Sequence, residues 1–60
     1  MTSYRLVLLA ENTLPERTGY VFCANETAAR EAAEALLRNN HGYASAEVFL
    51  EDQRLFVVTR

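Results

Sequence analysis

The chain has 60 residues, half of them hydrophobic, and a formal charge of −2. A chain of this length builds one small core, which leaves little room for a large catalytic cleft. The negative charge disfavours a generic basic clamp on nucleic acid. A single cysteine excludes an internal disulfide framework and a cysteine zinc site. We therefore expect one globular domain over residues 1–60, with no cofactor and no metal ion.

No targeting or membrane segment is recognisable in the sequence. The apolar run Leu6–Ala10 is followed at once by Glu11 and Asn12, whereas a secretory core needs about 7–15 apolar residues and a membrane helix about 20. We expect a soluble, cytoplasmic protein. All six basic residues are arginine, which hints at a GC-rich bacterial or phage genome.

Two strands are expected in the first part of the chain. Residues Ser3–Ala10 and Thr18–Cys23 are rich in Val, Leu, Phe and Tyr, and turn-like stretches bound them. The segment Glu11–Arg17 contains Pro15 and predicts a longer loop between the strands. We interpret Cys23, at a strand end, as a small buried hydrophobe.

A helix is the clearest element of the chain. Five apolar residues from Asn25 to His41 follow the i, i+3, i+4, i+7, i+8 spacing of one helical stripe: Ala29, Ala32, Ala33, Leu36 and Leu37. The opposite face alternates in charge at four-residue intervals: Glu26, Arg30, Glu34 and Arg38. We expect Asn25 to cap the start, His41 to interact with the last turn, and Gly42 to take the left-handed conformation beyond it.

Two further strands, Tyr43–Leu50 and Arg54–Thr59, follow the helix, and the short polar connection Glu51–Gln53 predicts a hairpin. The element order β-β-α-β-β predicts a small α+β domain. In it, one amphipathic helix packs on one face of a mainly antiparallel four-stranded sheet. The order of the strands within the sheet stays open.

One helix covers only one face of a sheet, so the strand alternation indicates what the other face carries. We place Ala44, Ala46, Val48 and Leu50 beneath the helix, with Leu55, Val57 and Thr59 in the last strand. The facing of Thr18–Cys23 stays open because it is apolar on both sides. The candidate partner-binding residues on the outer face are then Arg5, Val7, Leu9, Tyr43, Phe49, Arg54, Phe56, Val58 and Arg60.

Two interpretations of this outer face are open. Aromatic and arginine side chains around an apolar centre have the composition of a protein interface. Alternatively, long arginine stems lie over a few exposed apolar groups, as on many surfaces. We favour the interface because the pattern repeats in three strands.

The chain offers few side chains suited to catalysis. His41 is the one histidine and Cys23 the one thiol, and nothing in the sequence brings them together as a nucleophile and its base. No spacing matches a calcium loop, a phosphate-binding loop or a dinucleotide fingerprint. We do not expect an enzyme.

The chain opens with the strand Tyr4-Arg5-Leu6-Val7 and continues with a loop ending Arg17-Thr18-Gly19. A helix from Glu26 to Asn40, then His41-Gly42 and a closing hairpin complete it. In this layout, which covers nearly the whole chain, it resembles small phage-encoded anti-CRISPR proteins in which one helix lies across a sheet of four or five strands. The resemblance rests on element order and carries no functional motif. It implies a stoichiometric inhibitor that blocks a large nucleoprotein complex through one face.

The sequence thus favours a non-catalytic protein-binding module that acts through its outer sheet face or an edge strand and forms a homodimer. The most specific form of this hypothesis is an inhibitor of a host complex such as CRISPR-Cas. One alternative is a small nucleic-acid-binding sheet that stacks bases on Phe49 and Phe56, although Glu47 lies on the same face. A second alternative is a purely structural homodimeric subunit.

Overall fold

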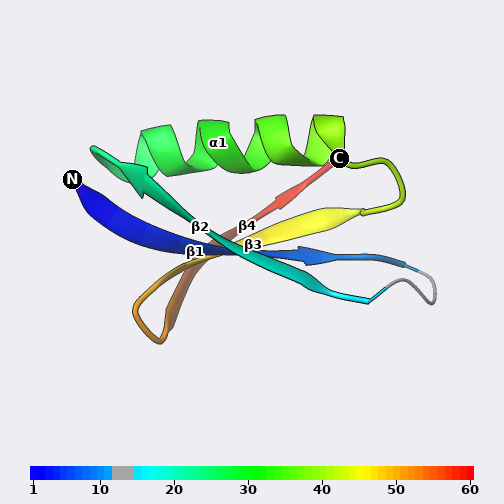
Figure 1. Ribbon diagram of the computed structural model, residues 1–60, viewed down its shortest axis with the longest axis horizontal. Coiled ribbons are helices and arrows are strands. Elements are labelled where there is room, and N and C mark those ends of the chain that lie inside the picture. Colours follow the sequence, from blue (N-terminus) through cyan, green and yellow to red (C-terminus); the bar gives the residue numbers. More distant parts are fainter. Residues whose placement is uncertain (12–14) are drawn as a thin grey trace.

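The computed structural model describes residues 1–11 and 15–60, so residues 12–14 of the predicted loop lie outside the described part. The elements are β1 (Thr2–Leu9), β2 (Arg17–Cys23), α1 (Glu26–Asn39), β3 (Ser45–Leu50) and β4 (Gln53–Thr59). The predicted element order is confirmed. Figure 1 shows α1 lying across one face of a twisted sheet.

The four strands form one antiparallel sheet in the order β2-β1-β3-β4. β1 and β3 lie at its centre, and β1 alternates between buried and half-buried or exposed residues until the consecutive buried run Leu6–Leu8. β2 and β4 are the edges. The predicted α+β class with a helix on a mainly antiparallel sheet is therefore confirmed, and the strand order that the sequence left open is now known.

The start of the helix and the glycine beyond its end agree with the sequence prediction. The Asn25 side chain accepts a hydrogen bond from the Ala28 amide at 2.9 Å, which satisfies one of the unpaired amides of the first turn. Glu26 in the first turn and Arg38 in the last both suit the helix dipole. Beyond the end, Gly42 has a φ of 100°, a conformation that glycine adopts without the steric cost of a Cβ.

The capping role predicted for His41 is wrong. The helix is capped instead by Asn40, whose amide donates to the Leu37 carbonyl at 3.3 Å and whose side chain donates to the Leu36 carbonyl at 2.8 Å. Asn40 performs both tasks because its short amide side chain reaches back one turn, while the exposed His41 already belongs to the turn that follows.

The core lies between α1 and the sheet. The helix contributes small side chains, above all Ala29 and Ala33, which are fully buried and allow the helix axis to lie close to the strands. From the sheet, Leu6, Leu8 and Val48 fill the space beneath it. Cys23 is a free thiol buried in the same cluster, as predicted.

The β3–β4 hairpin contains the irregularity that matters most for the sheet surface. Leu50 pairs with Gln53, so Glu51 and Asp52 alone make the turn, and Glu51 takes a φ of 57°. The pairing register then shifts between Val48 and Phe49, because Val48 pairs with Phe56 while Phe49 pairs with Arg54. Leu55 is the extra residue of a β-bulge, which lies opposite the single position Val48.

Candidate protein-binding face

The pairing register shows which side chains share a face of the sheet. Residues opposite each other in an antiparallel pair project to the same face, and their neighbours project to the other. Val48 is fully buried in the core under α1, so its partners Leu6 and Phe56 also lie on the helix-covered side. A cation–π contact from the helix supports this, since the Arg30 guanidinium lies 4.3 Å from the centre of the Phe56 ring.

The face that α1 leaves uncovered is named the open face below. Its central residues come from β1 and β3, where Arg5 pairs with Phe49, Val7 with Glu47, and Leu9 with Ser45. β4 adds Arg54, opposite Phe49, and Val57, opposite Glu47. β2 adds Thr18, opposite Val7, with Tyr20 and Phe22 further along the strand. No element of the described chain lies over this face in Figure 1.

Five of the nine candidate residues from the sequence do come together on the open face: Arg5, Val7, Leu9, Phe49 and Arg54. The most central of them is Val7. It is only 8% exposed although it is not part of the helix-covered core. The predicted alternation of β1 and β3 is therefore confirmed.

The predicted facing of β4 is wrong for its last four residues, Phe56–Thr59. Phe56 and Val58 lie on the helix-covered side, and Val57 and Thr59 lie on the open face. The bulge is the reason, because the extra residue Leu55 reverses the alternation for every position that follows it. Arg54 precedes the bulge and keeps its predicted side.

Tyr43 and Arg60 also lie away from the open face, and both were expected on it. Tyr43 precedes β3, so the strand alternation does not extend to it. Its ring is buried in the core and its hydroxyl donates to the Pro15 carbonyl at 2.9 Å. Arg60 turns to the end of α1 and donates hydrogen bonds to the carbonyls of Leu37, Asn40 and Tyr43.

Sequence reasoning missed the most exposed apolar side chains of the open face. Tyr20 is 72%, Phe22 68% and Val57 40% exposed. A signal for β2 was present, because an alanine-rich helix stripe leaves little space beneath it. The smaller side chains of Gly19, Val21 and Cys23 lie on that side, and the two aromatic rings point outward.

The charges of the open face are partly paired within the chain. Arg54 donates to the Glu47 carboxylate at 2.9 Å across β3 and β4. The Arg5 guanidinium lies 4.5 Å from the centre of the Phe49 ring, a cation–π distance. Arg5 Nε is buried and has no hydrogen-bond partner among the described residues. The face therefore presents an apolar centre with one arginine whose hydrogen-bonding capacity is not fully used.

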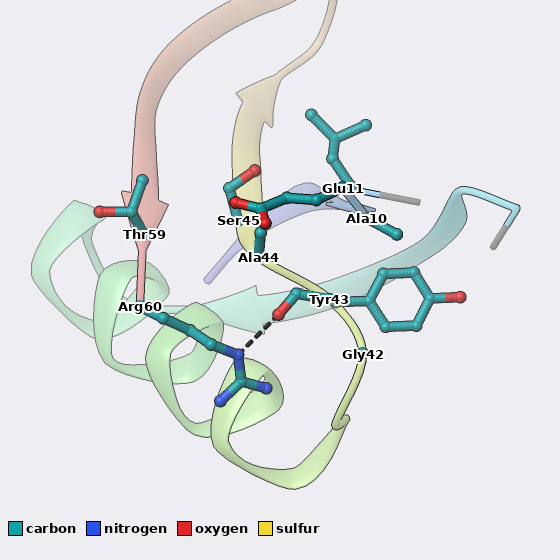
Figure 2. A pocket seen from close by; sticks show the side chains of 9 residues that line it. Ala10, Glu11, Gly42, Tyr43, Ala44, Ser45, Thr59 and Arg60 are labelled. Carbon is teal, nitrogen blue, oxygen red and sulfur yellow. Dashed lines mark hydrogen bonds between the residues drawn. The ribbon is translucent and has the colours of Figure 1, made fainter. Parts of the chain in front are cut away.

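A depression of about 630 Å³ lies where β1 ends and β3 begins, and its lining includes Leu9 and Ser45 of the open face (Figure 2). Glu11, Ser45 and Thr59 supply polar side chains at its wall. The Arg60 guanidinium beside it is already committed to backbone carbonyls, one of them that of Tyr43 at 2.6 Å. We interpret Arg60 as a clamp on the helix end, and the depression as open surface next to it.

Among the described residues, no three or more His, Cys, Asp or Glu side chains gather as metal ligands would. The described part of the chain also holds no helix that is both long and apolar enough to cross a membrane. The comparisons with known proteins add no relative, since no family model, no curated protein and no solved structure matches this chain.

Proposed function

We propose that the protein is a non-catalytic protein-binding module of the cytoplasm, and that it docks another protein on its open face. The observation that carries the proposal is the apolar surface that α1 leaves uncovered. It gathers Val7, Leu9 and Phe49 from the two central strands, with Val57 along one edge and Tyr20 and Phe22 along the other. Contiguous exposed apolar surface with a polar rim is typical of interaction sites.

The residues around this centre support the same use. Arginine and aromatic side chains contribute disproportionately to binding energy at protein interfaces. Arg5 is held over Phe49, so its guanidinium is oriented before a partner arrives and loses less conformational freedom on binding.

Base stacking on Phe49 and Phe56, the nucleic-acid alternative, has less support. The two rings lie on opposite sides of the sheet, and each already has an arginine over it. A platform for single strands needs neighbouring rings with free faces. The affinity for a single-stranded oligonucleotide, measured at several salt concentrations, tests this alternative, because phosphate contacts produce a steep salt dependence.

The identity of the partner stays a prediction. The most specific form of this proposal is inhibition of a large host complex such as CRISPR-Cas, and it rests on the order of the strands and the helix alone. A second copy of the chain is the other candidate occupant, and a homodimer of purely structural role is the corresponding alternative.

A capture experiment tests the proposal. The immobilised wild-type protein is incubated with lysate of its source cells and compared with Phe49→Ser, which removes an aromatic ring from the open face. Glu31→Ser is the matched control, because it removes an exposed side chain from the solvent side of α1. We expect at least one protein to be captured by wild type and by the control and to be lost with Phe49→Ser. Equal capture by all three would overturn the proposal, as would no specific capture at all.

A further inference from the structure

The two edges of the sheet differ in how open they are to another strand. An edge strand presents unpaired backbone N–H and C=O groups, and proteins protect such edges with bulges, charges or proline. β4 carries the bulge at Leu55 and the charged Arg54 beside it. β2 pairs with β1 without a shift in register over all seven residues, Arg17–Cys23, and its other edge faces no described element.

The composition of β2 offers none of the usual protection. It contains neither proline nor lysine nor an acidic residue, and its one charge is Arg17, at its first position. Its middle residue, Tyr20, is 72% exposed. Gly19 beside it has nothing within 4 Å of the place a Cβ would take, so no side chain shields the backbone there.

We propose that β2 pairs with β2 of a second copy of this chain, antiparallel, so that the two sheets join into one sheet of eight strands. This pairing supplies the contact between the two copies in the homodimer that was predicted from the sequence. It goes beyond the proposed function and does not depend on it, because it uses the backbone of an edge and leaves the centre of the open face free.

Symmetry specifies the register of this pairing. A two-fold axis perpendicular to the sheet keeps both helices on one side of it. Residues opposite each other in the two copies must then project to the same side of the sheet. Because side chains alternate along a strand, the numbers of two opposed residues are both even or both odd. Full overlap of Arg17–Cys23 places Tyr20 opposite Tyr20 of the second copy. Thr18 then lies opposite Phe22, and Gly19 opposite Val21.

The side chains are compatible with that register. Arg17 lies opposite Cys23, so the two arginines sit at opposite ends of the paired strands and no like charges face each other. On the open side, Tyr20 and the Thr18–Phe22 pairs combine aromatic and β-branched side chains, which are favourable cross-strand partners. On the helix side, Val21 of the second copy lies next to the space left by Gly19.

Cysteine cross-linking at the predicted axis tests the pairing. In a Cys23→Ala background, which removes the native thiol, Tyr20→Cys places two thiols at directly opposed positions. The Cα atoms of opposed residues are about 4.5–5.5 Å apart, a separation that a disulfide spans. Thr18→Cys in the same background is the matched control. It lies four residues from its own copy in the second chain, about 14 Å along the strand and out of reach.

We expect Tyr20→Cys to be converted mostly to a disulfide-linked dimer under mild oxidation, and Thr18→Cys alone to stay mostly without a disulfide link between the copies. A mixture of Thr18→Cys with Phe22→Cys should form the linked heterodimer. Circular dichroism checks that each variant is folded. The proposal is overturned if Tyr20→Cys links no faster than Thr18→Cys, or if Val57→Cys at the other edge links as fast. Neither result changes the capture expected for the open face, so the two proposals fail separately.

Discussion

The two faces of this sheet differ in how far their apolar side chains are buried. On the side under α1, Ala29, Ala33 and Val48 are fully buried in one continuous cluster. On the open face, Val7 is 8% exposed, while Phe22 is 68% and Val57 40% exposed. Burial is what converts apolar surface into stability, at about 25 cal/mol per Å² removed from water. The helix-covered face therefore supplies most of the free energy of folding, and the open face leaves apolar side chains exposed that only a partner would bury.

The difference in burial between the two faces is informative because the chain is small. A domain of this size buries only about 60% of the surface of its unfolded chain, so its stability is marginal. Apolar side chains left on an open face contribute little to that stability. Arg5 over Phe49 and the Arg54–Glu47 ion pair organise this surface without covering it. Such an arrangement is expected where the residues of a surface contribute to binding a partner and not to the stability of the fold.

The largest expected effect is in the helix-covered core. Leu37→Ala removes a side chain that is 3% exposed at the centre of the cluster. We expect the free energy of unfolding to fall by about 2–5 kcal/mol, because the cavity collapses only in part. Urea unfolding followed by circular dichroism measures the loss. Leu36→Ala, at a half-buried position, should cost clearly less, and an equal cost at both positions would contradict this account of the core.

The next effect concerns the clamp at the end of α1. Arg60→Ala removes the donors to the carbonyls of Leu37, Asn40 and Tyr43, and we expect a loss of about 1–3 kcal/mol because these are charge-assisted hydrogen bonds. Arg38→Ala, in the exposed last turn, is the control and should cost under about 0.5 kcal/mol. Similar thermal midpoints for the two variants would show that Arg60 is not a clamp.

The two glycines should respond in opposite directions. Gly42→Ala forces a Cβ into a backbone with a φ of 100° and should destabilise the fold by about 1–2 kcal/mol. Gly19→Ala meets open space on the helix-covered side and should stabilise it by about 0.4–1 kcal/mol, since the unfolded chain loses freedom. Thermal unfolding of both variants checks the signs. A loss of stability at Gly19 would mean that the space beneath α1 is not available.

The sequence predicted the regular parts of the fold well, and the reason is periodicity. The alanine stripe, the Asn25 cap and the alternation in β1 and β3 are local patterns, and each was confirmed. The bulge at Leu55 is set by how β3 and β4 pair, so no local pattern revealed it, and it moved Phe56 and Val58 away from the predicted site. Tyr43 failed for a related reason, because the strand begins two residues after it and its hydroxyl bonds to a distant carbonyl.

The open face was predicted in its centre and missed at its edges. Arg5, Val7 and Phe49 lie on the two central strands, where alternation is strict. Tyr20 and Phe22 lie on an edge strand that is apolar on both sides, so its facing depends on the packing of Val21 and Cys23 into the core under α1. That packing is a tertiary property, and the alanine-rich stripe of the helix was the one indirect sign of it in the sequence.

The measurement that tests the central claim most directly is the free energy of unfolding of the double variant Phe22→Thr/Val57→Thr. Both side chains lie on the open face, and threonine keeps the preference for a strand. If the open face is reserved for a partner, urea unfolding at a concentration where the protein is monomeric should give a value within about 1 kcal/mol of wild type. A loss as large as that of Leu37→Ala would contradict the account, because the open face would then be part of what holds the fold together.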